Sequence, residues 1–264
     1  MKFSIITVCY NSEKTIRRTF ESVLAQKFAD YEYIVVDGAS KDSTLDIIKE
    51  YQVQFNGRMR YISEPDKGIY DAMNKGIAMA QGEFLNMLNS DDQLAEDALE
   101  IIDRYSIKYP DTDIFNGCEK KIDVNGMEIT VLRNPAHYLP YGIEIRHQSA
   151  FIRRSLHDRI GLYNGDKYSV SADYEFFLRA YRMGAVITPC DSVISVFSAD
   201  GTSIHNPMKN AVQINRIRLD HNCISKIKYH LLICRSFYNI KIALKIRQIF
   251  YKISGICFKA LNIR

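Results

Sequence analysis

The stretch from Phe3 to Asp37, FSIITVCYNSEKTIRRTFESVLAQKFADYEYIVVD, decides the fold. It contains two short runs rich in apolar and β-branched residues, Phe3 to Cys9 and Tyr33 to Asp37, on either side of a helical pattern from Glu13 to Gln26. A strand, a helix and a second strand in this order are the unit from which parallel sheets are built. The pattern therefore predicts an α/β fold.

The same alternation continues to about residue 110, and the texture then changes. Further helices are expected at Thr44 to Tyr51, Ile69 to Ala80 and Ala95 to Tyr109, and further strands at Met59 to Ser63 and Glu83 to Leu88. Short strands at Asp113 to Cys118 and Lys120 to Arg133, with a turn at Asn125-Gly126, predict an antiparallel insertion. A strand at His147 to Ile152, a helix at Ala172 to Met183 and strands near Val186 and Val193 return to a mixed, mainly parallel sheet.

Composition is that of an ordinary globular protein, with 47% apolar and 25% charged residues in 264. The six cysteines are scattered and form no CxxC pair, which predicts reduced thiols and neither disulfides nor structural zinc. The first apolar run is too short for a signal peptide. The sequence contains no run of eighteen apolar residues, so no membrane-spanning helix is expected. We therefore expect the protein in the cytoplasm.

Charge is distributed unevenly along the chain. Nine of the 35 basic residues follow Asp220 and no acidic residue does, which leaves 26 bases against 31 acids before it, a balance of −5. Residues 207–264 are expected to form a basic helical extension, and from Lys241 to Lys259 isoleucines share one face with lysines along its edge. Such a face can enter the headgroups of an anionic membrane through residues 226–264, or it can pack back onto the preceding domain. No recognised nucleic-acid module accompanies the charge.

Polar residues that directly follow parallel strands mark the ligand edge of an open α/β sheet. Adjacent carboxylates in Asn89-Ser90-Asp91-Asp92 repel each other unless a cation or donor lies between them. A hard divalent ion, Mg²⁺ or Mn²⁺, meets that need with few protein ligands and completes its shell with substrate phosphates. The alternative is that Asp91 or Asp92 caps a following helix.

Two further segments carry polar groups at this edge. In Asp37-Gly38-Ala39-Ser40, the carboxylate can accept the imide N–H of a uracil or contact a ribose, while Asp42 or Ser43 caps the next helix. In residues 63–76, SEPDKGIYDAMNKG, a glycine turn leads into a helix whose first N–H groups can meet a diphosphate. The chain contains neither a GxGxxG nor a Walker A loop, which argues against a dehydrogenase or a P-loop NTPase.

Taken in order, four motifs resemble glycosyltransferase family 2, and within it the transferases of colanic acid, O-antigen and capsule clusters. They are TVCYN at residues 7–11, VVDG at 35–38, EPDKGIYDAMNKG at 64–76 and LNSDD at 88–92. The match covers roughly residues 1–200, a domain-sized span. The resemblance implies a GT-A fold over residues 1–206, with a nucleotide-sugar half at 1–110 and an acceptor half at 111–206.

The resemblance also implies roles for single residues. Asp37 would read the base, Thr7 and Tyr10 would line the nucleotide pocket, and Asn74 with Gly68 would lie near the ribose and the diphosphate. Asn89-Ser90-Asp91 takes the place of the DxD motif with Asn first, so metal binding is assigned mainly to Asp91 with help from Asp92. The remaining donor-side candidates in these motifs are Asn11, Gly38, Ser40, Lys67 and Ser90.

On the acceptor side, Ser171-Ala172-Asp173-Tyr174-Glu175 resembles the acidic motif of the family at a helix start. Asp173 is the candidate base that takes the proton of the acceptor hydroxyl, and the alternative is that it caps its helix while Glu175 is solvated. His147 and Gln148 resemble a family position near the acceptor or the diphosphate, although a lone His is more often structural. Asp200-Gly201-Thr202-Ser203 departs from the double-glycine loop often found there.

These observations predict an inverting glycosyltransferase. It would use a divalent metal to move a sugar from a nucleotide-diphosphate sugar to a lipid-linked saccharide of a surface polysaccharide, at the inner face of the membrane. A non-catalytic sugar-nucleotide-binding scaffold is the alternative, and it predicts donor binding without turnover. A nucleotidyltransferase would need a glycine-rich basic loop near the N-terminus, where only Lys2 and Lys14 occur.

Overall fold

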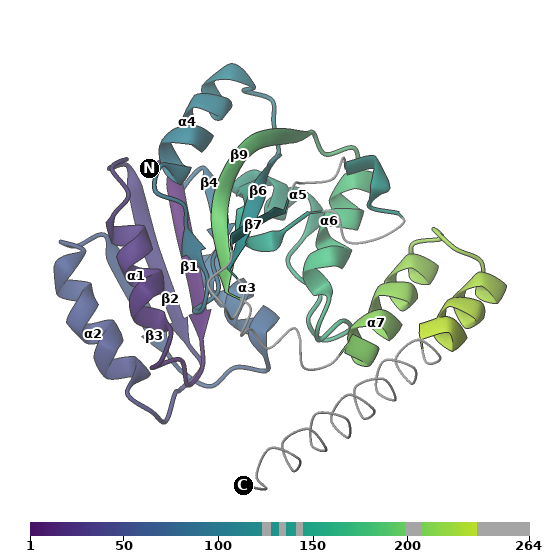
Figure 1. Ribbon diagram of the computed structural model, residues 1–264, viewed down its shortest axis with the longest axis horizontal. Coiled ribbons are helices and arrows are strands. Elements are labelled where there is room, and N and C mark those ends of the chain that lie inside the picture. The colour runs from purple at the N-terminus through teal and green to yellow at the C-terminus, as the bar shows by residue number, and fades with distance from the viewer. Residues whose placement is uncertain (123–127, 132–135, 141–144, 199–206, 237–264) are drawn as a thin grey trace, which may run out of the picture. The chain divides into compact units, whose positions relative to one another are not determined.

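The protein is described from a computed structural model, which covers residues 1–122, 128–131, 136–140, 145–198 and 207–236 (Figure 1). Its contacts divide the chain into two compact units, Met1–Ile204 and His205–Arg264. The turn expected at Asn125-Gly126 and the loop from Asp200 to Ser203 lie outside the described residues.

The first part of the larger unit alternates strands and helices, as the sequence predicts. β1 pairs in parallel with both β2 and β4, and β2 pairs in parallel with β3. The elements are β1 (Phe3–Cys9), α1 (Ile16–Leu24), β2 (Tyr31–Asp37), α2 (Thr44–Gln54), β3 (Met59–Ser63), α3 (Ile69–Met79), β4 (Phe84–Met87), β5 (Gln93–Leu94) and α4 (Ala98–Lys108).

The second part extends the same sheet with antiparallel pairings. It contains β6 (Ile114–Ile122), β7 (Glu128–Val131), two 3-10 helices (Ala136–Tyr138 and His147–Ser149), β8 (Ala150–Arg153), α5 (Arg154–Ile160), α6 (Ala172–Arg182) and β9 (Ile187–Ser198). β8 is antiparallel to β4 and β6, whereas β9 is parallel to β6. The nine strands of the described residues follow the order β3-β2-β1-β4-β8-β6-β9-β5, with β7 on β6.

The prediction of a mixed, mainly parallel sheet flanked by helices is therefore confirmed, and three local expectations are wrong. His147–Ser149 forms a 3-10 turn before β8 instead of the start of a strand. The two strands expected near Val186 and Val193 are one long strand, β9. The short helix α5 was not expected from the sequence.

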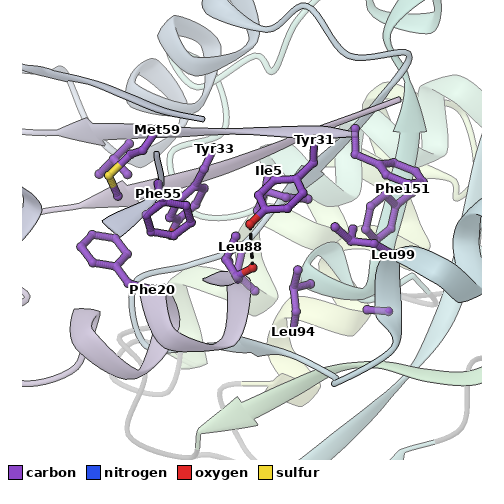
Figure 2. Packing of buried hydrophobic residues seen from close by; sticks show 14 of the residues in the cluster. Ile5, Phe20, Tyr31, Tyr33, Phe55, Met59, Leu88, Leu94, Leu99 and Phe151 are labelled. Carbon is purple, nitrogen blue, oxygen red and sulfur yellow. Dashed lines mark hydrogen bonds between the residues drawn. The ribbon is translucent and has the colours of Figure 1, made fainter. Parts of the chain in front are cut away.

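Helices α1, α2 and α4 bury one face of the sheet beneath an apolar and aromatic layer (Figure 2). In this layer the ring centroid of Tyr33 lies 5.7 Å from that of Phe20 and 5.1 Å from that of Phe55. The hydroxyl of Tyr31 donates to the carbonyl of Val23 at 3.1 Å, so this buried polar group is satisfied (Figure 2). Full burial of one large apolar side chain contributes about 1.5–3 kcal/mol to folding. This layer therefore stabilises the sheet whose strand ends carry the polar edge.

Helix α3 covers the opposite face, and Gly76 allows its close approach. A Cβ at Gly76 would clash with the side chain of Ile6 and lie 3.5 Å from Val36. The segment that leads into α3 is joined to the end of β2, because the amide of Glu64 donates to the carbonyl of Asp37 at 3.0 Å. The packing therefore places the first turn of α3 at the edge where β2 and β3 end.

The second unit contains α7 (Pro207–Asp220) and a further helix over residues 226–236. The second helix exposes Ile227 and Leu231, with exposed fractions of 76% and 66%. The isoleucine and lysine stripe predicted from Lys241 to Lys259 lies outside the described residues. Within the part of the chain that the structure describes, no helix has the length and apolar character needed to cross a membrane.

Candidate active site

The loops that follow β1, β2 and β4 are joined by short polar side chains into one edge. Asn11, which has a left-handed backbone (φ 50°), donates its amide N–H to Ser40 Oγ and accepts the Lys41 N–H on Oδ1, both at 2.8 Å. The hydroxyls of Ser12 and Ser90 lie 2.9 Å apart. The three segments that the sequence singles out therefore meet at the carboxyl edge of the sheet, where ligands of open α/β folds bind.

Asp37 ends β2 and is fully buried beneath this edge. Its carboxylate accepts hydrogen bonds from the hydroxyls of Ser40 and Ser63, the latter at 2.6 Å, and from the Ser40 amide at 3.1 Å. The side chain therefore holds the loops after β2 and β3 in place. Its predicted role as reader of the base stays a prediction, and a uracil imide would have to replace one of the serine hydroxyls.

The side chain of Thr7 points away from the polar edge, and its predicted place in the nucleotide pocket stays a prediction. It is fully buried, and its hydroxyl accepts a hydrogen bond of 2.8 Å from Tyr33 on the face covered by α1 and α2. Tyr10, in contrast, is 57% exposed and can stack against a base. A Cβ at Gly38 would meet the Asp66 carboxylate and lie 3.4 Å from the Tyr10 ring, so Asp66 is a further polar group at this position that the sequence analysis missed.

The Asn89-Ser90-Asp91-Asp92 segment divides into a buried and a partly exposed part. Asp92 is fully buried, accepts a 3.1 Å hydrogen bond from the Asn89 amide, and receives the Thr19 hydroxyl on its backbone carbonyl at 2.7 Å. These contacts organise the loop, and the predicted helper role of Asp92 in metal binding stays a prediction. No helix begins directly after Asp92, since the next element is β5, so the helix-cap alternative is wrong.

The remaining oxygens of this loop fit a hard divalent ion. Asp91 and Ser90 are partly exposed at the edge. The amide oxygen of Asn89 is buried and has no hydrogen-bond partner among the described residues. Carboxylate and amide oxygens are the donors that Mg²⁺ and Mn²⁺ accept. In the described part of the chain no three His, Cys, Asp or Glu side chains form a metal cluster.

The start of α3 is less open to an anion than the sequence suggests. The amide N–H of Lys67 donates to Asp71 at 3.0 Å, and that of Gly68 donates to Asp66 at 2.8 Å. Lys75 forms an ion pair with Glu64 at 2.8 Å. Carboxylates of the chain therefore bind the two amides that precede α3, and the predicted contact of the helix N-terminus with a diphosphate stays a prediction.

Asn74 joins the nucleotide-sugar half to the acceptor half. Its amide donates to the carbonyl of Tyr163 at 2.9 Å and accepts the Tyr163 N–H at 3.1 Å. The first turn of α3 and the loop of residues 163–169 border a polar pocket of about 130 Å³, which Asn74 lines with Asp71, Asn164 and others. The side chain of Asn74 therefore positions the acceptor-side loop, and its predicted place near the ribose and the diphosphate stays a prediction.

Asp173 lies in the first turn of α6 and faces α3. The residue that precedes this helix is Ser171, and the carboxylate of Asp173 accepts a hydrogen bond from the Tyr70 hydroxyl at 2.8 Å. Asp173 is partly exposed. This contact links the predicted base with the donor side across 103 residues of sequence. Tyr70 was not among the site residues predicted from the sequence.

The other acceptor-side candidates are buried and bound to internal groups. Gln148 donates to the Glu119 carboxylate, and Glu175 forms an ion pair with Arg179 at 3.1 Å. His147 lies 2.7 Å from the Tyr163 hydroxyl, and burial lowers its pKa while the charge of Asp173 opposes the shift. Their predicted place on the acceptor side stays a prediction.

A second buried histidine completes this cluster. The His157 ring stacks on Phe176 at 4.7 Å, and its two nitrogens have no hydrogen-bond partner among the described residues. Burial, and then the charges of His147 and Arg179, lower the pKa of His157 to about 4. At neutral pH it is therefore an uncharged part of the core next to Tyr163, whose ring lies 5.9 Å away.

Comparison with known families and proteins gives one consistent result. The family described as "Glycosyl transferase family 2" matches this chain over residues 4–161. A PGL/p-HBAD biosynthesis glycosyltransferase of Mycobacterium bovis (strain BCG / Pasteur 1173P2) is 34% identical over 191 residues, 70% of this chain and 72% of the relative. An uncharacterized glycosyltransferase of Mycobacterium tuberculosis (strain ATCC 25618 / H37Rv) is 31% identical over 206 residues, 76% of this chain and 77% of the relative.

Solved structures share the fold at low sequence identity. S. aureus TarS 1–349 in complex with UDP-GlcNAc has a TM-score of 0.66 at 20% identity, covering 90% of this chain and 72% of TarS 1–349. The mannosyltransferase PcManGT from Pyrobaculum calidifontis, in complex with GDP-Man and Mn²⁺, has a TM-score of 0.68 at 14% identity, covering 97% and 80%. Both share the fold described above.

Proposed function

The chain belongs to glycosyltransferase family 2, and we propose that it transfers one sugar, with inversion, from a UDP-sugar to a lipid-linked saccharide of a surface polysaccharide. The observation that carries this proposal is the 2.8 Å contact between Tyr70 on α3 and Asp173 on α6. The contact supports the proposal because Asp173 is the candidate base and α3 follows the donor-side loops. A base in that position would face a donor from the acceptor side, as direct displacement requires.

In the proposed reaction, Asp173 takes the proton of the acceptor hydroxyl while the hydroxyl oxygen attacks the anomeric carbon. The bond from that carbon to the diphosphate oxygen breaks, and its electron pair leaves with the nucleoside diphosphate. Attack from the face opposite the leaving group inverts the anomeric configuration. A Mg²⁺ or Mn²⁺ ion held by Asn89 and Asp91 would neutralise the negative charge that develops on the diphosphate.

The donor is proposed from the edge and from the structural relatives. Tyr10 offers an exposed ring for stacking, and Asp37 and Asp66 supply carboxylates that can accept the imide N–H of a uracil. The TarS structure with UDP-GlcNAc supports a UDP-sugar, and the mannosyltransferase with GDP-Man and Mn²⁺ supports a divalent ion. A nucleobase with an N–H donor would compete with the hydroxyl of Ser63 or Ser40 for the carboxylate of Asp37.

The acceptor and the place of action are proposed from the second unit. The helix over residues 226–236 exposes Ile227 and Leu231 next to Lys226, Lys228 and Arg235. Apolar side chains flanked by basic residues suit an anionic membrane surface, where each Lys or Arg contributes about 1 kcal/mol. We place the protein on the cytoplasmic face of the membrane, where a lipid-linked acceptor would be within reach. Sedimentation with vesicles tests this: phosphatidylglycerol should retain the chain, phosphatidylcholine should not, and Ile227→Glu with Leu231→Glu should abolish retention.

The transfer itself is tested by nucleotide release. UDP-glucose, UDP-galactose, UDP-N-acetylglucosamine and GDP-mannose are each offered with octyl glycosides as acceptors, with and without EDTA. We expect UDP release from one UDP-sugar that depends on the acceptor, stops in EDTA and returns with Mn²⁺ or Mg²⁺. Undiminished turnover in EDTA would remove the metal from the mechanism. Donor binding without turnover would favour the non-catalytic scaffold.

A further inference from the structure

Tyr70 is placed where its hydroxyl controls the carboxylate of Asp173. It is the second residue of α3, its side chain is 6% exposed, and its hydroxyl lies 2.8 Å from Asp173 Oδ1. The two residues belong to different helices, one from each half of the larger unit. Tyr70 is therefore a direct contact between the donor side and the candidate base.

The surroundings of Tyr70 leave it little freedom. Its ring centroid lies 5.8 Å from that of Tyr163, and a Cβ at Gly165 would lie 2.8 Å from the Tyr70 Cβ. One turn further along α3, Asn74 holds the backbone of Tyr163 through two hydrogen bonds. The loop of residues 163–169 thus fixes the ring, and the ring fixes the direction of its hydroxyl.

The hydroxyl acts as a donor. Burial and the negative charge of Asp173 raise the pKa of Tyr70 well above its usual value, so the phenol keeps its proton. A carboxylate has two oxygens that can take a proton, and rotation of the side chain exchanges them. A donor fixed on Oδ1 stops that rotation and directs Oδ2 to the acceptor.

We propose that Tyr70 is the positioning residue of the base: its hydrogen bond to Oδ1 orients Asp173 so that Oδ2 receives the acceptor proton. This inference rests on the proposed function. The acceptor proton passes to Oδ2 as the new bond to the anomeric carbon forms, and the electron pair of the breaking bond leaves with the diphosphate. Tyr70 keeps its proton throughout, so it acts through Asp173.

A matched pair of Tyr→Phe variants tests the proposal. Tyr174 is the neighbour of Asp173 in α6, is 1% exposed, and donates to the Leu139 carbonyl at 2.7 Å, so Tyr174→Phe also removes one buried hydrogen bond. Tyr70→Phe removes a hydrogen bond to a charged group, so kcat should fall about 10- to 100-fold while the donor KM stays unchanged. Tyr174→Phe should keep kcat. Equal kcat in Tyr70→Phe and the unsubstituted chain, or equal losses in both variants at equal thermal stability, would overturn the proposal.

A double substitution separates positioning from a general structural role. If Tyr70 acts through Asp173, Tyr70→Phe should cause no further loss of kcat in an Asp173→Asn background. Independent and multiplicative losses would contradict the proposal. The assay uses the donor and octyl glycoside that support turnover in the unsubstituted chain.

A measurement without substrate keeps the inference distinct from the proposed function. Proton NMR of the full chain should show a downfield tyrosine hydroxyl resonance that is lost in Tyr70→Phe, shifts in Asp173→Asn and remains in Tyr174→Phe. Its absence, or no response to Asp173→Asn, would contradict the contact. A chain that shows the resonance but transfers no sugar from any of the four donors would refute the proposed function and, with it, the catalytic meaning of the contact.

Discussion

The polar edge of the sheet and the junction between α3 and α6 are held together by different kinds of side chain. At the edge, Asn11, Ser12 and Ser40 join loops that already lie side by side because parallel strands end together. At the junction, Tyr70 and Asn74 reach elements that are 103 and 89 positions away in the sequence. The parallel topology brings the loops of the edge together. The junction instead depends on a few side chains that are long or that both donate and accept hydrogen bonds.

This difference has a functional consequence. At the edge, many short hydrogen bonds share the support of the loops, so one substitution there should weaken donor binding or stability in part. At the junction, one carboxylate is held by one hydroxyl. A single change at the junction should therefore have the larger effect on turnover, and the following variants measure the contrast.

The largest effect is expected for Asp173→Asn. The amide cannot take the acceptor proton, and loss of a positioned general base costs about 10²- to 10⁴-fold in kcat. Donor KM and thermal stability should change little. Glu175→Gln, two residues along the same helix, is the control: it breaks a buried ion pair with Arg179, so stability should fall while kcat of the folded enzyme is retained. Equal activity of Asp173→Asn and the unsubstituted enzyme would refute the assignment of the base.

The sequence predicted much of the fold because strand burial is so regular. All seven residues of β1 and of β2 are buried, and the apolar runs of these strands are visible without a structure. The helix α5 has only seven residues and four of them are charged or histidine, so no helical period marks it. β9 was divided in two because Pro189 and Asp191 interrupt its apolar pattern.

The meeting of the loops that follow the strands was predicted from the sequence, but the directions of some side chains in them were not. Thr7 follows a strand phase shared with Phe3 and Ile5, both of which lie in the buried layer, so alternation along β1 could have shown that its side chain points inward. On α3 the buried face includes Tyr70 and Gly76, while Ile69 is 43% exposed. A glycine within a helical pattern signals close packing, and this signal could have directed attention to the face that contains Tyr70.

The next effect in size separates the two adjacent carboxylates of the edge. Asp91→Asn should lower kcat about 10²-fold and raise the Mn²⁺ concentration needed for half-maximal activity, because a charged metal ligand is lost. Asp92→Ala should instead lower the free energy of unfolding by about 1–3 kcal/mol, since the buried Asn89 amide loses its acceptor. Manganese titrations and urea unfolding of both variants measure this. An unchanged Mn²⁺ requirement in Asp91→Asn would show that the metal, if used, binds elsewhere.

A smaller effect concerns pH and the histidine cluster behind the junction. The pKa of His157 is lowered to about 4 in the folded chain, below the value of about 6.5 in an unfolded one. Between these values the unfolded state binds the extra proton, so stability should fall as the pH drops from about 6.5 to 4, by on the order of 3 kcal/mol from this group. His157→Phe should flatten that dependence in urea unfolding at several pH values, and His137→Gln, at an exposed position, is the control. The same slope in His157→Phe would assign the acid sensitivity to other groups.

The last pair of variants compares two hydroxyl groups that join loops of the edge. Ser63→Ala removes a 2.6 Å hydrogen bond to the buried carboxylate of Asp37, and loss of a bond to a charged group costs about 1.5–3 kcal/mol. Ser90→Ala removes a 2.9 Å bond between two neutral hydroxyls, for which about 0.5–1.5 kcal/mol is expected. Urea unfolding measures both. If Ser63→Ala costs no more than Ser90→Ala, the Ser40 hydroxyl and amide alone satisfy Asp37, and Ser63 is then the group that an incoming base can replace at least cost.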